Sequence, residues 1–108
     1  MAASLDLEGM GSAVRARRIE WQRHALERMA ARNIGRSEVF QVLLGGERIE
    51  DYPDTEPFPS ALFMGLCATR PLHVVAAYDS SEDRVFVITV YEPDLEHFEP
   101  DFKTRRTQ

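Results

Sequence analysis

The chain has 108 residues, of which 44% are hydrophobic and 29% are charged, and its formal net charge is −5 at pH 7. This length suits one domain with a buried core, and the composition excludes a disordered polyelectrolyte. The single cysteine, Cys67, excludes an internal disulfide and fits a reducing compartment, and no apolar run approaches the ~20 residues that span a bilayer. We therefore expect a cytoplasmic protein that does not contact a membrane.

The first segment, residues 1–16, carries no helical or strand periodicity. Its residues are mostly small and include two glycines, which is typical of a flexible leader. We therefore expect a single domain over residues 17–108. Its first element is a short strand at 17–21, where Ile19 and Trp21 point to the same side.

Two short helices are expected next. Leu26 and Met29 have helical spacing and predict a helix over 22–32, and the Asn-Ile-Gly sequence after it suits a left-handed cap. Ser37 is the expected N-cap of a second helix over 38–45, which a Gly-Gly pair ends. The short connection predicts a helical hairpin.

The second half of the chain has the two-residue period of β-strands. The predicted strands are ERIEDY at 47–52, ALFMGLCA at 61–68, LHVVAAYD at 72–79 and RVFVITVY at 84–91. Most connections are short and polar, so neighbouring strands are expected to be antiparallel. Phe98 and Phe102 are expected to anchor the tail. The predicted fold class is α+β, with two N-terminal helices packed on a mainly antiparallel, four- to five-stranded twisted sheet.

Charge is distributed unevenly along the chain. Residues 15–36 hold seven arginines and two glutamates, net +5, and residues 103–108 add a net +3. Between them, residues 37–102 hold fourteen acidic residues and three arginines, net −11. The arginine stripe at 15–36 either solvates a helical surface or holds a phosphate or an acidic partner, because a local basic patch can bind a polyanion even on an acidic protein.

Three histidines are candidates for acid–base chemistry, because imidazole titrates near neutral pH. His24 and Arg28 lie four residues apart on the first predicted helix, so they share a face where a guanidinium can hold a phosphate beside the imidazole. His73 lies on a strand that resembles core, and His97 lies in the turn after the last strand. Each has a structural alternative, in which the ring only hydrogen-bonds a carbonyl or carboxylate and supports packing.

The last strand and the residues after it add further polar groups. Thr89 and Tyr91 are expected to share a face with the valines that precede them, where their hydroxyls either bind a substrate oxygen or simply reach the sheet edge. The acidic residues of 92–96, beside His97, have the composition of a metal site but no specific ligand spacing. A solvated acidic rim is the better interpretation, so we expect no metal and no cofactor.

Five blocks, taken in order, carry a family resemblance. They are HALERMAARNIGRSEV at 24–39, GERIEDYPD at 46–54, FPSALFMG at 58–65, RPLHVVAAYD at 70–79 and TVYEPDLEHFEPDFKTRR at 89–106. Together they resemble the bacterial family called domain of unknown function 4258. That family is similar to RelE-like, barnase-like and colicin-nuclease-like folds, whose members are often toxins of toxin–antitoxin pairs. The resemblance therefore implies a RelE-like fold.

If the resemblance extends to activity, the chain is a metal-independent endoribonuclease toxin, with RNA or the ribosome as target and an antitoxin as partner. Cleavage by attack of a ribose 2′-hydroxyl on its own phosphate needs a base, an acid and a cation. The candidate catalytic residues are His24, Arg28, His73 and Tyr91. The candidate substrate-binding residues are Arg23, Arg32, Arg70 and Thr89.

The alternative function is a non-catalytic protein-binding module of unknown function, which docks a partner through the arginine stripe or a sheet edge. The net charge of −11 over residues 37–102 favours this alternative, because it repels RNA. A fold shared with nucleases does not by itself establish nuclease activity. The sequence makes no prediction of the oligomeric state.

Overall fold

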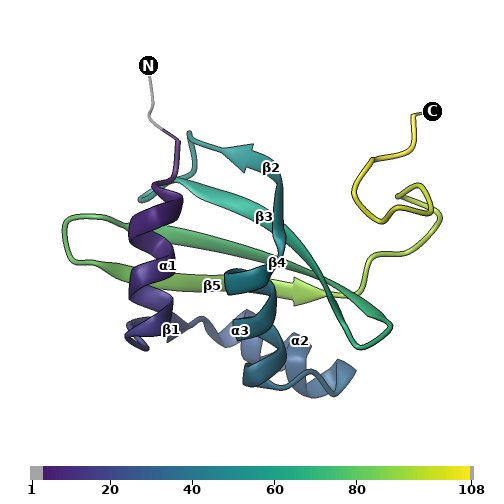
Figure 1. Ribbon diagram of the computed structural model, residues 1–108, viewed down its shortest axis with the longest axis horizontal. Coiled ribbons are helices and arrows are strands. Elements are labelled where there is room, and N and C mark those ends of the chain that lie inside the picture. Colours follow the sequence, from purple (N-terminus) through teal and green to yellow (C-terminus); the bar gives the residue numbers. More distant parts are fainter. Residues whose placement is uncertain (1–3, 108) are drawn as a thin grey trace.

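The computed structural model describes residues 4–107, which form three helices and five strands (Figure 1). In chain order these are α1 (Leu7–Arg15), β1 (Ile19–Trp21), α2 (Arg23–Arg32), α3 (Arg36–Gly45), β2 (Glu47–Tyr52), β3 (Ser60–Cys67), β4 (Arg70–Asp79) and β5 (Arg84–Tyr91). The predicted α+β class is confirmed, and each predicted helix and strand appears close to its expected bounds. In the described residues, no helix is long and apolar enough to cross a membrane.

All five strands belong to one sheet, in the order β1-β5-β4-β3-β2. β2, β3, β4 and β5 pair antiparallel in succession, as the short connections predicted. β1 differs, because it lies parallel to β5 at the edge and pairs Ile19 with Val85 and Trp21 with Val87. The sheet is therefore mixed, although most of its pairings are antiparallel.

The expectation of a flexible leader does not hold for residues 7–15, which form α1. The Asp6 carboxylate caps this helix by accepting the Gly9 N–H at 3.1 Å. Met10 and Val14 lie on its buried side, four residues apart. The glycines in this segment lower its helix propensity, so packing on the sheet stabilises α1 and local propensity does not reveal it. Residues 4–107 thus form three helices, where two were expected.

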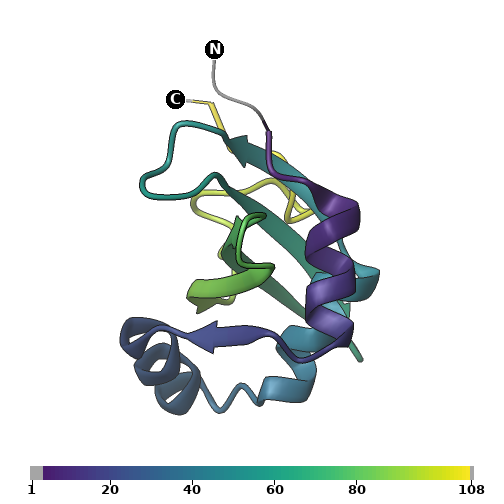
Figure 2. The same ribbon diagram turned by 90° about the vertical axis from the view of Figure 1, so that its left-hand side faces the viewer.

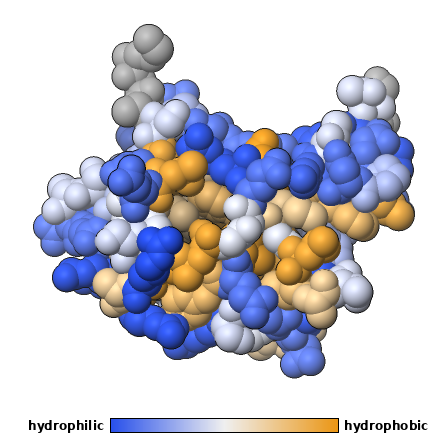
Figure 3. All heavy atoms as spheres, in the orientation of Figure 1, coloured by the Kyte–Doolittle hydropathy of each residue, from blue (hydrophilic) through white to orange (hydrophobic). Residues whose placement is uncertain are grey.

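The helices divide the sheet into two unlike faces. α1 and α3 cross in front of the strands, and α2 lies at the β1 end of the sheet (Figures 1 and 2). The largest fully buried apolar side chains between these helices and the sheet include Met10, Val14, Val39, Val42, Val74 and Val87. Figure 3 shows this helix-bearing side, where apolar residues gather at the centre and polar residues surround them.

The chain after β5, residues 92–107, crosses the opposite side of the sheet, which we call the tail face. Phe98 is only 3% exposed and its ring meets the His73 ring edge-on, with 4.6 Å between centroids. Lys103 pairs with Glu47 of β2 at 2.9 Å. Phe98 therefore anchors the tail as predicted, and the tail covers one end of this face.

Candidate functional site

A β-bulge in β5 decides which of its side chains reach the tail face. The pairing with β4 passes from Thr89 directly to Val87, so Ile88 is the extra residue. Val87 is buried in the helix-side core, whereas Tyr91 lies against His73 on the tail face. Our expectation that Thr89 and Tyr91 share a face with the preceding valines is therefore wrong, because it assumed uninterrupted alternation.

A second irregularity has the same effect in β2. The pairing with β3 passes from Arg48 to Glu50 and skips Ile49. Glu47 pairs with Met64 and Glu50 with Leu62, two residues apart on β3, so both glutamates lie on the tail face. Strict alternation would have placed them on opposite faces.

The register arranges the tail face in three rows that run across four strands. The first row is Glu47, Met64, His73 and Tyr91; the second is Glu50, Leu62, Val75 and Thr89; the third is Tyr52, Ser60, Ala77 and Phe86. Successive rows are two residues apart along β3 and β4, which is about 7 Å, and the bulges in β2 and β5 each add one residue between two of the rows. Polar groups from β2, β4 and β5 therefore come within reach of one another.

His73 is the buried titratable group of this face. Its Nε2 lies 2.7 Å from the Phe102 carbonyl oxygen, and its Nδ1 lies 3.2 Å from the Tyr91 hydroxyl. Because a carbonyl only accepts, Nε2 carries the proton and the Tyr91 hydroxyl donates to Nδ1 of the neutral ring. Burial lowers the pKa of His73 below its ordinary value, although the Phe102 carbonyl and the charge of Glu50 act in the opposite direction. The lowered pKa therefore favours the neutral ring at pH 7.

Glu50 carries the charge of this face and is held by the tail. Arg105 donates from Nε to Oε2 at 2.6 Å and from Nη2 to Oε1 at 3.1 Å, and the Tyr52 hydroxyl also donates to Oε1. Burial alone would raise the pKa of Glu50, but the hydrogen bonds from Arg105 and Tyr52 outweigh it and lower the pKa. The Arg105 side chain is 54% exposed, so an anion from solvent can reach it.

We call Glu50, Tyr52, His73, Tyr91 and Arg105 the polar cluster. It contains a carboxylate that can accept a proton, two phenol hydroxyls that can donate, an imidazole and a guanidinium that can hold an anion. Sequence reasoning did not select three of these residues. The bulge hides the position of Glu50 and Tyr52, and Arg105 joins the cluster across more than fifty residues of chain, so no local pattern marks it.

The structure brings together only some of the residues predicted from the sequence. His73 and Tyr91 are in contact, and Thr89 lies in the row next to theirs, the same row as Glu50. His24 and Arg23 instead line a hollow beside the third row, together with Phe86. Arg28 and Arg32 are exposed on α2.

Arg70, predicted to bind substrate, has its guanidinium engaged by other parts of the fold. It donates to the carbonyls of Arg32 and Asn33 at the end of α2 and pairs with Glu92 at 3.0 Å and Glu38 at 3.6 Å. The side chain is 27% exposed. These contacts join α2, α3 and β4, which is a structural role.

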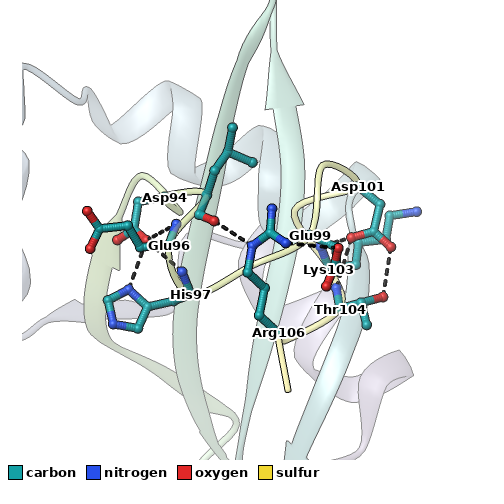
Figure 4. A network of polar contacts seen from close by, with 9 residues as sticks. Asp94, Glu96, His97, Glu99, Asp101, Lys103, Thr104 and Arg106 are labelled. Atoms are coloured by element: carbon teal, nitrogen blue, oxygen red, sulfur yellow. Dashed lines mark hydrogen bonds and ion pairs between the residues drawn. The ribbon is translucent and has the colours of Figure 1, made fainter. Parts of the chain in front are cut away.

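The turn after β5 contains the polar pair that resembled a metal site. Asp94 accepts from the backbone of Glu96 and His97, and its carboxylate lies 2.8 Å from the His97 ring (Figure 4). The hydrogen bonds that His97 donates lower the pKa of Asp94. Across residues 4–107, no three His, Cys, Asp or Glu side chains are grouped so that they could hold a metal ion.

Comparison with known proteins gives one family match, over residues 21–92. The chain belongs to the family called domain of unknown function 4258. The match ends just after β5, so it includes Glu50, His73 and Tyr91 and leaves out α1 and the tail. In this member of family 4258, Arg105 therefore comes from outside the matched segment. No curated protein matches the chain.

Proposed function

We propose that this member of family 4258 is a metal-independent endoribonuclease that serves as the toxin of a bacterial toxin–antitoxin pair. The observation that best supports the proposal is the polar cluster, where Glu50, Arg105 and the Tyr91–His73 pair lie on one sheet face. These groups supply the base, the cation and the acid that cleavage by a ribose 2′-hydroxyl needs. As the toxin of such a pair, the protein would act on the RNA of its own cell, in the cytoplasm.

In the proposed reaction, the Glu50 carboxylate accepts the proton of a 2′-hydroxyl. The 2′-oxygen attacks the adjacent phosphorus, the bond from phosphorus to the 5′-oxygen breaks, and a 2′,3′-cyclic phosphate forms. The 5′-oxygen takes the proton of the Tyr91 hydroxyl, which regains one from Nδ1 of protonated His73. Glu50 then releases its proton to solvent, and His73 takes one up.

Arg105 has two successive partners in this scheme. In the free protein it is bound to Glu50, and an incoming phosphate competes for its guanidinium, which leaves Glu50 free to act as a base. In the transition state Arg105 stabilises the additional charge on the phosphate oxygens. His24 and Arg28, the other predicted pair, are on α2 and take no part in these steps.

The pH dependence of cleavage follows from the two titrating groups. The reaction needs Glu50 ionised and His73 protonated, and both groups have a lowered pKa. The value of kcat/KM, which reports the groups of the free protein, should rise with pH as Glu50 ionises below pH 4.5 and fall as His73 loses its proton below pH 6.5. We therefore expect an acidic optimum, and the Tyr91→Phe variant should show little cleavage at any pH.

The first test is cleavage of purified single-stranded RNA in the presence of EDTA, followed by analysis of the new 3′ ends. The second test measures the growth of bacteria that express the protein. Wild-type protein should leave 2′,3′-cyclic phosphates and slow growth. Glu50→Gln and Tyr91→Phe should lose roughly 100- to 10,000-fold in rate. The matched control is Glu47→Gln, which lies in the row next to Glu50 and breaks the exposed ion pair with Lys103, so it should keep full activity.

Two outcomes would change this proposal. If His24→Ala with Arg28→Ala abolishes cleavage while Glu50→Gln and Tyr91→Phe keep it, the chemistry lies on α2. If wild-type protein leaves RNA intact and growth normal, the nuclease proposal fails. Each variant also needs a thermal melt, because loss of folding imitates loss of activity.

A different observation favours the alternative, a protein-binding module. The Arg17 guanidinium lies 4.2 Å above the Phe40 ring, and that of Arg36 lies 5.2 Å from the Trp21 ring. These four side chains line one hollow between β1 and α3. Cations held against aromatic rings suit an acidic segment of a partner such as an antitoxin. Arg36→Glu should then weaken capture of that partner and leave RNA cleavage unchanged.

A further inference from the structure

The hollow beside the third row, which Arg23 and His24 line on the tail face, has no role in the chemistry described above. Its volume is about 650 Å³, and it is bounded by the start of α2, the loop from β2 to β3 and the third row of the sheet. Figure 2 shows the two outer boundaries, with α2 and the β2–β3 loop both extending from the sheet on the side away from α1. The tail contacts Glu47 and His73 of the first row and Glu50 of the second, whereas the described residues that line the hollow include none from the tail.

The hollow is lined by a pair of aromatic rings. The rings of Phe58 and Phe86 stack with 5.5 Å between their centroids and 11° between their planes. Both side chains are half-buried, and the small side chain of Ala77 lies beside Phe86 in the same row. A half-buried ring next to a small residue leaves room for a planar group to stack on its open face.

The rim beside α2 is cationic and polar. Arg23 and His24 are the first residues of α2, and within residues 4–107 the polar partner of Arg23 is Glu27, in an exposed pair at 3.3 Å. Such a pair contributes little to stability, so Arg23 can turn to a phosphate without loss. The opposite rim carries Glu56, which disfavours a phosphate on that side. A ligand with one flat ring and one anionic group therefore fits with its anion toward α2.

We propose that this hollow holds one base of a single-stranded RNA, which stacks on the outer face of the Phe58–Phe86 pair while Arg23 pairs with its phosphate. The inference rests on the proposed nuclease function and names the substrate subsite beside it. The third row lies about 7 Å from the row of Glu50, so one nucleotide spans the distance between the hollow and the polar cluster.

The test measures binding without cleavage. The probe is a short, fluorescently labelled, single-stranded oligodeoxynucleotide, which lacks the 2′-hydroxyl that the proposed reaction needs. Phe86→Leu and Phe58→Leu keep apolar bulk and remove the flat ring, so each should weaken binding roughly 5- to 150-fold. The aromatic control is Phe40→Leu, on the other side of the molecule. Its affinity for the probe should equal that of the wild type.

A second pair of variants separates the specific phosphate contact from general charge. Arg23→Gln and Arg32→Gln each remove one exposed arginine from α2, and only Arg23 lines the hollow. Arg23→Gln should therefore weaken binding of the probe more than Arg32→Gln does, and it should also reduce the salt dependence of binding more. Equal effects of the two variants would overturn the phosphate contact.

Three results would overturn the subsite. The first is that the probe does not bind saturably. The second is that a folded Phe86→Leu variant binds the probe as tightly as the wild type. The third is that Phe40→Leu loses as much affinity as Phe86→Leu. The subsite and the nuclease function fail separately. Binding that depends on Phe86 without RNA cleavage removes the nuclease function alone, whereas cleavage with Phe86-independent binding removes the subsite alone.

Discussion

Replacing Gly46 by alanine should destabilise the fold sharply. A Cβ at this position would lie 2.5 Å from the Val42 carbonyl oxygen and 2.5 Å from the Met64 carbonyl oxygen, whereas ordinary contacts begin at 3.4 Å. The backbone at Gly46, φ −85° and ψ −170°, is one that alanine adopts freely, so the cost is steric. Both oxygens belong to the backbone, one in α3 and one in β3, so the helix end and the strand must separate.

The cost can be assembled from two contributions. Overpacking of a well-packed contact costs about 1–3 kcal/mol. Separation also strains the hydrogen bond from the Gly46 N–H to the Val42 carbonyl, 2.9 Å long, and its loss adds ~1 kcal/mol. We expect Gly46→Ala to lower the free energy of unfolding by about 2–4 kcal/mol, which for a domain of this size lowers Tm by roughly 10–25 °C.

Gly45→Ala is the matched control, because a Cβ at Gly45 meets no atom within 4 Å. Its stability should be unchanged or up to ~1 kcal/mol higher, since alanine is the better helix former. Urea unfolding followed by circular dichroism measures both variants. If the two unfold within ~0.5 kcal/mol of each other, the reasoning from the contact geometry is refuted.

Three further predictions concern the contacts that hold the site. Arg70→Ala should lower the free energy of unfolding by about 2 kcal/mol, measured in urea, and Arg70→Lys should recover only part because an ammonium cannot replace the guanidinium fork. Phe98→Ala should release the tail, so that trypsin cuts at Arg105 faster than in wild-type protein. Because the pKa of His73 is lowered in the folded state, its contribution to stability is present above pH 6.5 and is lost as pH falls through the folded pKa. Denaturation at several pH values should show this loss, by at most ~1.4 kcal/mol per pH unit from this group, and His73→Gln should remove it.

Local patterns predicted the elements of this fold well and the site less well. The spacing of Leu26 and Met29 located α2, and alternation with polar turns located the strands. α1 was missed because its glycines conceal a helix that depends on packing. The parallel pairing of β1 with β5 is set by contacts distant in sequence, which no local pattern encodes.

Only part of the site was predicted, because local patterns do not encode the contacts that assemble the rest of it. His73 and Tyr91 were selected for their chemistry and are in contact. Glu50 was passed over because one skipped residue in β2 changes the face on which it lies. Arg105 is joined to Glu50 only by the path of the tail across the sheet. Bulges and long-range docking are therefore the two physical causes of the missing site residues.

The parallel pairing of β1 with β5 also sets an order of events during synthesis. β1 ends at Trp21, and its only hydrogen-bonded neighbour in the described sheet begins at Arg84. A growing chain can form α2, α3 and the β2–β4 meander early, but β1 stays unpaired until β5 leaves the ribosome. Until then, the apolar sides of α1 and α2 have no complete sheet to cover. A translating ribosome that stalls before residue 84 would thus carry a nascent chain with exposed apolar surface, which chaperones and proteases recognise.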